Sequence, residues 1–278
     1  MGFDGFIPLS PSGEGSQQRN TMRPLFALIK REFSAYFLSP VAYVTLAVFL
    51  AVTGAAFGKV LAGLTTPGSA GIEYPYQAWL GDEKFWLVFL FIPPLLTMRL
   101  FAEERGTGTL ETLLTAPIRD WQVVAGKYIG AMMFYVVLWL PTLAYLPILT
   151  DLTIADGKWN FGIDPRPVLT SYLGVMLAGG MFLALGLLVS SLVKSQLVAA
   201  MLAMVVGLVF VLAAFWRPDA DSGSLFNRLV YFISVPEHFR RDFTRGIVDT
   251  RPLVLYLSVS AVCLFLTVRS LEFRRLRA

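Results

Sequence analysis

Residues 103–127 read EERGTGTLETLLTAPIRDWQVVAGK and form a polar interval between two strongly apolar segments. Gly106 and Gly108 are predicted to end the preceding helix, and Glu111 falls in the first turn of a new short helix, where a carboxylate suits the positive end of the helix dipole. Pro117 ends this short helix. Three leucines share one of its faces: Leu110, Leu113 and Leu114. We predict a leucine-ridged helix on one face of a membrane, where a soluble partner can bind it.

The composition around this interval is that of a multispanning membrane protein. Of the 278 residues, 56% are hydrophobic and only 15% are charged, compared with about 25% charged residues in soluble domains. About 20 apolar residues at a rise of 1.5 Å cross a bilayer core of roughly 30 Å, and the alternating pattern of a β-barrel is absent. We therefore predict an all-α fold in which residues 22–278 form a single transmembrane domain. Six spans are expected, at about 41–64, 83–101, 121–149, 168–193, 197–216 and 252–268.

The N-terminal region divides into two parts. Residues 1–21 are rich in Gly, Ser, Pro and Gln and are predicted to be a disordered leader. Residues 24–38 are predicted to form an amphipathic helix in the plane of the membrane interface. Its apolar residues recur at helical spacing: Leu25, Leu28, Ile29, Phe33, Tyr36 and Phe37. The charged residues cluster elsewhere on the helical wheel: Lys30, Arg31 and Glu32.

Capping residues and prolines predict where the spans begin and bend. Asp82 and Asp120 are placed to cap the second and third spans. The pair Pro93-Pro94 removes two backbone donors and should kink the second span, and Pro141 and Pro147 should interrupt the third. Because proline is common in membrane spans, we interpret these positions as tolerated kinks rather than hinges.

Basic residues predict the orientation of the chain. More Lys and Arg residues flank the spans on the side of the two termini than on the other side, which places both termini in the cytoplasm. The chain is then expected to be a multi-pass protein of the cytoplasmic (inner) membrane. Its basic residues flank the spans and do not form a basic face with interleaved aromatic residues, so no nucleic-acid partner is expected.

Several kinds of chemistry are not supported by the sequence. Central parts of the spans carry almost no ionisable residue, which disfavours a proton-coupled carrier or a membrane-embedded enzyme. A single cysteine, Cys263, and a single histidine, His238, are too few ligands for zinc, haem or iron–sulfur sites. No G-x-x-x-x-G-K-[ST] motif occurs, so ATP cannot be held in a phosphate loop. We therefore expect a non-catalytic subunit that binds no cofactor itself.

The run AEERGTGTLETLLTAPIRDWQVVAGKY, residues 102–128, resembles the signature loop of type 2 ATP-binding cassette (ABC) exporter permeases. The resemblance is closest to the subgroup associated with gliding motility and multicopper-enzyme maturation. It implies a membrane permease subunit of an ATP-driven exporter. It also implies two copies of a cytoplasmic ABC ATPase, which carry the ATP and Mg, and a second permease subunit, identical or different.

The resemblance also implies which residues contact the ATPase. Residues 108–114 correspond to a cytoplasmic coupling helix between spans 2 and 3. The implied coupling residues are Glu103, Glu104, Arg105, Gly108, Thr109, Leu110, Glu111, Leu113, Leu114 and Pro117. The implied interface-helix residues beside them are Leu28, Lys30, Arg31 and Glu32.

Other interpretations of these features are retained. The polar interval could be an ordinary solvated connector, and residues 24–38 could anchor the chain on the membrane with or without a partner contact. The chain as a whole could be a non-transporting scaffold or a channel component.

The spacings Gly54/Gly58 and Gly126/Gly130 favour close packing within the chain over a dimer interface. Residues 226–248 are expected to form an outer amphipathic segment that dips into the outer leaflet or lies on its surface. The apolar spans do not select among lipidic, drug-like and extended substrates.

Overall fold

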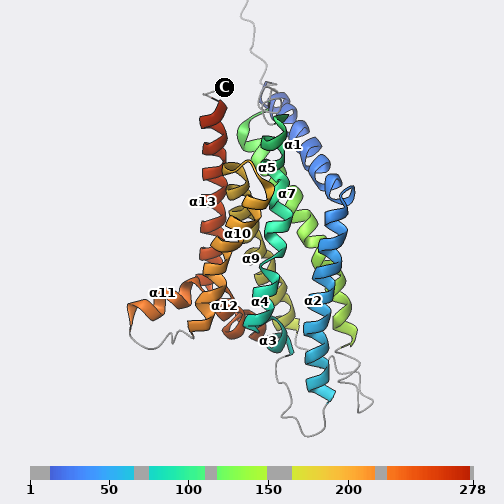
Figure 1. Cartoon of the computed structure of the whole chain (residues 1–278), viewed down its shortest axis with the longest axis vertical. Helices are drawn as coiled ribbons and strands as arrows, with labels where there is room; N and C mark the ends of the chain where they lie inside the picture. Colours follow the sequence, from blue (N-terminus) through green and yellow to red (C-terminus); the bar gives the residue numbers. More distant parts are fainter. Residues whose placement is uncertain (1–12, 66–74, 110–117, 149–164, 217–223, 276–278) are drawn as a thin grey trace, which may run out of the picture.

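The computed structural model describes residues 13–65, 75–109, 118–148, 165–216 and 224–275. Within these ranges the regular structure is helical and no strand occurs (Figure 1). Six helices are long and apolar enough to cross a membrane, which confirms the predicted all-α fold with six spans. They are Pro40–Gly63, Glu83–Thr107, Asp120–Ile148, Pro165–Leu192, Gln196–Trp216 and Thr250–Arg275.

The second span consists of two helices joined at a break. α4, Glu83–Phe89, begins at Asp82, whose side chain accepts a hydrogen bond of 3.0 Å from the backbone N–H of Lys84. α5, Ile92–Thr107, follows with Pro93 and Pro94 in its first turn. A proline in the first turn loses no intrahelical donor, so the chain starts a new helix here. The predicted cap and the predicted interruption are both confirmed.

The third span also changes geometry at a proline. α7, Asp120–Trp139, passes into the 3-10 helix η1, Leu140–Ala144, which contains Pro141. The sequence suggested Asp120 as the N-cap of this helix, but the N-cap is Arg119. The Arg119 backbone N–H donates to Oε1 of Gln122 at 3.1 Å. Asp120 is instead in the first turn, where its charge still interacts favourably with the helix dipole.

α9, Pro165–Leu192, is the central helix. In its most apolar window 72% of the residues are buried within the chain, compared with 28% for α2 (Pro40–Thr65) and 22% for α13 (Thr250–Arg275). α9 packs against α5, α7, α13 and α10, Gln196–Leu212, and α10 continues into η2, Ala213–Trp216. The exposed apolar faces of α2, α10 and α13 are therefore the surfaces available to lipid.

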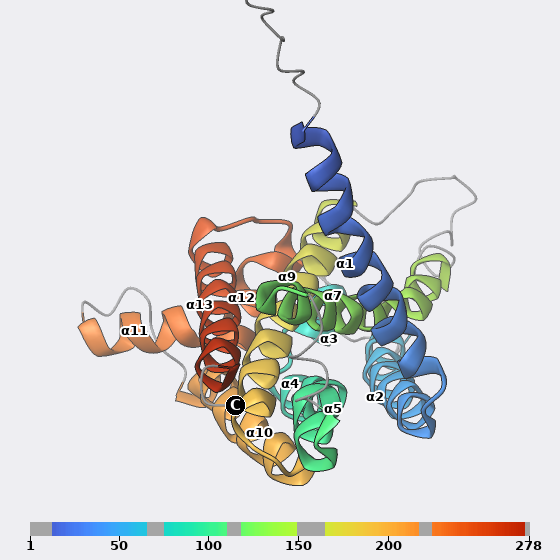
Figure 2. The same cartoon turned by 90° about the horizontal axis from the view of Figure 1, so that it is seen from above.

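The N-terminal helix α1, Gly13–Phe37, lies obliquely across one end of the bundle, next to α7, and leads into α2 (Figures 1 and 2). It begins within the segment predicted to be a disordered leader, so that prediction is wrong from Gly13 onward. No proline occurs between residues 12 and 23, and the Gln, Arg and Met residues there have favourable helix propensities. Residues 1–12 lie outside the described part of the chain.

The two ends of the bundle differ. The end that holds α1, the end of α5 and the end of α13 is called the α1 end (Figure 1). The opposite end, called the α12 end, holds α3, α11, α12 and η3 (Figure 1). Their bounds are Pro75–Leu80, Leu225–Ile233, Val235–Arg241 and Phe243–Arg245. α11 projects sideways from the bundle and exposes Leu225, Phe226 and Leu229, whereas α12 is mostly buried. How deeply α11 enters a leaflet stays a prediction.

His238 connects three helices at the α12 end. It is buried, its Nε2 lies 3.1 Å from the carbonyl oxygen of Tyr231, and its Nδ1 lies 3.0 Å from the hydroxyl of Tyr256. Because a carbonyl oxygen can only accept, Nε2 carries the proton and Nδ1 accepts from Tyr256. Burial lowers the pKa of His238 to about 4, which outweighs the opposing effects of the Tyr231 carbonyl and Asp249.

Because His238 is buried with a lowered pKa, we expect the folded chain to lose stability in acid. Between pH 6.5, its ordinary pKa, and pH 4 the unfolded chain binds a proton at His238 that the folded chain does not. The free energy of unfolding should therefore fall as the pH drops through this window, by up to about 3 kcal/mol. Thermal unfolding of the wild type and of His238→Gln at pH 7.5 and pH 4.5 measures the effect. The wild type should lose more stability than the variant, and equal losses would contradict the prediction.

Candidate functional site

The polar interval starts and ends at the α1 end. α5 ends at Gly108, which has φ 76° and so adopts the left-handed conformation that favours glycine at the C-terminus of a helix. α7 then begins at Asp120 at the same end, where Oδ1 of Asp120 lies 3.2 Å from Nη1 of Arg275 in α13. Residues 110–117 lie outside the described residues. They include five of the predicted coupling residues: Leu110, Glu111, Leu113, Leu114 and Pro117. The coupling helix itself therefore stays a prediction.

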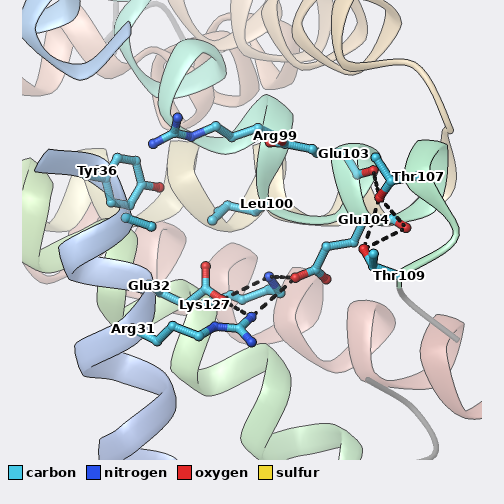
Figure 3. Close-up of a pocket in the computed structure, with 11 residues that line it drawn as sticks. Arg31, Glu32, Tyr36, Arg99, Leu100, Glu103, Glu104, Thr107, Thr109 and Lys127 are labelled. Atoms are coloured by element: carbon cyan, nitrogen blue, oxygen red, sulfur yellow. Dashed lines mark hydrogen bonds and ion pairs between the residues drawn. The ribbon is translucent and has the colours of Figure 1, made fainter. Parts of the chain in front are cut away.

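The described residues beside this interval form a cleft of about 490 Å³ between α1, α5 and α7 (Figure 3). Charged side chains from all three helices line it: Arg31 and Glu32 from α1, Arg99, Glu103 and Glu104 from α5, and Lys127 from α7. Segments far apart in the sequence thus meet at one charged site. Five of the predicted coupling and interface residues are among its lining residues: Arg31, Glu32, Glu103, Glu104 and Thr109.

Lys127 is the centre of the charged cluster. Its side chain is 1% exposed, and its Nζ lies 2.8 Å from Oε1 of Glu104 and 3.2 Å from Oε1 of Glu32. It also lies 5.3 Å from the centroid of the Phe101 ring, on which it can make a cation–π contact. A buried ammonium is stable only with such partners. Lys127 therefore holds α1 and α5 against α7.

Arg31 completes the cluster at its exposed edge. Its Nη2 lies 2.8 Å from Oε1 of Glu32 and 3.4 Å from Oε1 of Glu104 (Figure 3). We call Arg31, Glu32, Glu104 and Lys127 the four-charge network. Oε2 of Glu104 is buried and accepts no hydrogen bond from the described residues. Since leaving such an acceptor unsatisfied costs free energy, one further donor to this oxygen would stabilise the network.

Glycines bring α1 and α7 close enough for this network to form. A Cβ atom built at Gly126 would lie 2.7 Å from Cδ2 of Leu28, and one at Gly130 would lie 2.8 Å from Cβ of Glu32. The prediction that this glycine pair packs within the chain is confirmed. For the other pair, a Cβ at Gly54 would lie 3.5 Å from the Tyr145 hydroxyl, and one at Gly58 would meet nothing within 4 Å.

The buried face of α1 differs from the predicted one. Glu32 is buried on the same stripe as Leu28 and Tyr36, because residues four apart share a helix face. The prediction that Glu32 groups with Lys30 and Arg31 away from the apolar stripe is therefore wrong. Lys30 is exposed, as expected.

Arg105 points away from the cleft and binds the turn between the fourth and fifth spans. Its Nη1 donates to the carbonyl oxygens of Ser191 at 2.9 Å and of Val193 at 3.0 Å. A Cβ at Gly106 would lie 3.2 Å from the Lys194 carbonyl oxygen, so Gly106 does not end the helix as predicted but allows this close approach inside α5. The end of α5 is thus fixed to the α9–α10 turn.

Two further cleft residues, the aromatic Tyr36 and the cationic Arg99, were not among the predicted site residues. The Tyr36 hydroxyl donates to the Leu96 carbonyl oxygen at 2.9 Å, and burial raises the pKa of Tyr36 well above its usual value. The guanidinium carbon of Arg99 lies 5.0 Å from the centroid of the Tyr36 ring (Figure 3). Lys127 was also missed as a site residue, although a lysine inside an apolar helical segment indicates a buried partner.

The remaining predicted residues are accessible at the α1 end. Glu103, Gly108 and Thr109 are exposed, and the Thr107 and Thr109 hydroxyls lie 3.0 Å apart. In the described part of the chain no cluster of three or more His, Cys, Asp or Glu residues could hold a metal ion. The arrangement offers an exposed polar rim next to a buried ionic connection.

Comparison with known proteins gives two findings. Residues 79–235, more than half of the chain, match the family described as "ABC-2 family transporter protein". The chain is also similar to the "Probable multidrug ABC transporter permease YbhR" of Escherichia coli strain K12 and of Escherichia coli O157:H7, with 27% identity over 149 residues in each case. The similar region covers 50% of this chain and 37% of each relative, so well under two thirds of the relatives' length is matched.

Proposed function

Since this chain belongs to the ABC-2 family of transporter proteins, we propose that it is a permease subunit through which a separate ATPase drives export of a substrate. The membrane subunit itself is then non-catalytic, and ATP and Mg bind the partner. The proposal includes two ATPase copies, a second permease subunit, and an inner-membrane location with the α1 end in the cytoplasm. We propose export as the direction of transport because residues 102–128 resemble the signature loop of exporter permeases.

The observation that carries the proposal is the set of connections leading away from the polar interval. On one side, the four-charge network connects the end of α5 to α1 and α7. On the other side, Arg105 connects it to the α9–α10 turn. A displacement imposed on the interval by an ATPase would therefore be passed to the second and third spans, to the turn between the fourth and fifth spans, and to the interface helix. A simple connector between two spans does not require these contacts.

The exposed rim supplies the contact surface in this proposal. Glu103 and Thr109 are accessible, and the predicted leucine ridge follows directly in the sequence. Lys30 is exposed on α1 near the same end. An apolar ridge flanked by charged residues matches the general anatomy of protein interfaces, which have an apolar centre and a polar rim.

Leu113→Asp tests the proposal. A central apolar residue of an interface contributes about 2 kcal/mol or more, so this change should weaken ATPase binding by about 30-fold. The tagged chain is purified from its native cells in mild detergent, and any copurifying cassette ATPase is quantified by mass spectrometry and by ATP hydrolysis.

Leu229→Asp is the matched control, because Leu229 is an exposed leucine of α11 at the opposite end. It should retain the ATPase. Equal ATPase recovery with Leu113→Asp and the wild type would refute the role of the ridge. If no ATPase copurifies with the wild type, the chain is instead a scaffold or a channel component.

A further inference from the structure

One arginine of the cleft, Arg99, makes no ion pair with the described residues. Arg31 and Lys127 are paired with Glu32 and Glu104 within the four-charge network. Arg99 forms no ion pair with any carboxylate of the residues that the structure describes, although Glu103 follows one turn later on α5. Its guanidinium extends instead towards Tyr36 (Figure 3). The part of the cleft between α1 and α5 therefore has a guanidinium that no carboxylate of the described residues contacts.

The depth of Arg99 places this cation near the lipid headgroups. It lies about two turns before the end of α5 at Thr107, or roughly 12 Å at 1.5 Å per residue, within the membrane span. Phe37 and Leu38, which follow Tyr36 at the junction of α1 and α2, are 41% and 85% exposed. These apolar side chains suit contact with acyl chains. A charge at such a boundary is stabilised by an anion at the same depth.

We propose that this cleft binds the phosphate of an anionic phospholipid headgroup. Arg99 is the main contact, because a guanidinium matches the geometry of phosphate with two parallel hydrogen bonds. The Tyr36 ring holds the guanidinium in place, and Arg31, whose side chain is 57% exposed at the mouth, is a second contact. The volume of about 490 Å³ lies within the range of roughly 300–1,000 Å³ that is usual for small-molecule sites.

This lipid site goes beyond the transport function. The bound lipid is a component of the α1–α5 junction and need not be transported. An acidic side chain of the partner ATPase is the competing occupant, but it would have to reach about two helical turns below the end of α5. The depth of Arg99 and the exposed apolar residues that follow Tyr36 in the chain, Phe37 and Leu38, favour lipid.

The experiment measures lipid retention by native mass spectrometry on the purified full chain in detergent. Three added lipids are compared: phosphatidylglycerol, phosphatidylcholine and diacylglycerol, which has no phosphate. Wild-type chain should retain phosphatidylglycerol most and diacylglycerol least. Arg99→Gln should lower the retention of phosphatidylglycerol at least about tenfold, which corresponds to 1.4 kcal/mol. Lys194→Gln, which removes an exposed positive charge at the same end, should leave it unchanged.

Two further variants keep the test decisive if Arg99→Gln folds poorly. Arg99→Lys keeps the charge and should retain part of the binding. Ala35→Trp keeps Arg99 but fills the cleft that Ala35 lines, and should also displace the lipid. Three outcomes would overturn the proposal: retention of phosphatidylglycerol by both Arg99→Gln and Ala35→Trp, equal retention of diacylglycerol, or loss of ATPase copurification with Arg99→Gln while lipid retention is unchanged. Binding of millimolar inorganic phosphate by a wild-type chain that retains no phosphatidylglycerol would assign the site to a soluble phosphate instead.

Discussion

Lys127→Met is expected to lower the free energy of unfolding by roughly 3–5 kcal/mol, the range found when one partner of a buried ion pair is removed. The substitution leaves the carboxylates of Glu32 and Glu104 close together without their shared cation. Arg31 remains, but its side chain is 57% exposed and its contact with Glu104 is the longer one, at 3.4 Å. Equilibrium unfolding in mixtures of detergent and sodium dodecyl sulfate measures the loss.

The expected loss depends on uncompensated charge and not on lost packing. The triple variant Glu32→Gln/Glu104→Gln/Lys127→Met removes both carboxylates together with the ammonium and should recover most of the stability. Lys30→Met is the control for removing a positive charge from the same end, because Lys30 is exposed. If the triple variant were as unstable as Lys127→Met, the network would not be the cause.

The same variant connects stability to the proposed coupling. In Lys127→Met the ionic contacts of α7 with α5 and α1 are lost, and α5 keeps only the longer Arg31–Glu104 contact to α1 within the network, while the connection from Arg105 to the α9–α10 turn is retained. Any folded fraction should therefore bind the ATPase but couple its hydrolysis poorly to transport. A Leu113→Asp variant should fail at the earlier step, the binding of the ATPase.

The six spans could be predicted because their signal is local. A run of about 20 apolar residues satisfies its own backbone as a helix, and the lipid selects it by length. The cap at Asp82 and the interruption at Pro93-Pro94 were also predictable, because each depends on neighbouring residues only. The burial of Glu32 in α1 could also have been predicted from a local signal. Leu28, Glu32 and Tyr36 are spaced by four residues and therefore share one face of the helix.

The charged site depends on contacts between distant parts of the chain and could not be predicted in this way. Glu32 and Lys127 are 95 residues apart, and Arg105 lies 86 residues from its acceptor Ser191. A single sequence does not indicate which helices are neighbours, so neither pairing follows from it. Lys127 shows the limit clearly: its place in an apolar segment indicates that a partner is needed but not which one.

The second large effect is expected at Gly179 in the central helix α9. A Cβ atom at this position would overlap the ring of Tyr135 in α7. That ring is fully buried, its hydroxyl donates to the Val175 carbonyl oxygen at 3.1 Å, and it has Trp139 and Phe89 as neighbours with centroids 6.3 Å away. Gly179→Leu therefore forces apart two packed spans, at a cost of about 3 kcal/mol or more, and breaks a buried hydrogen bond worth about 1 kcal/mol. The yield of monodisperse protein on size-exclusion chromatography should fall sharply.

Two variants separate overpacking from a general effect of changing a membrane-helix glycine. Gly58→Leu should leave the yield unchanged, because a Cβ at Gly58 meets no atom of the described residues within 4 Å. Gly179→Leu combined with Tyr135→Ala should recover part of the yield, since removing the ring provides the volume that the leucine needs. Recovery would assign the defect to the Gly179–Tyr135 contact. A double variant as defective as Gly179→Leu would instead indicate that α9 needs the flexibility of glycine at this position, and the close packing of α7 on α9 would then not explain the loss.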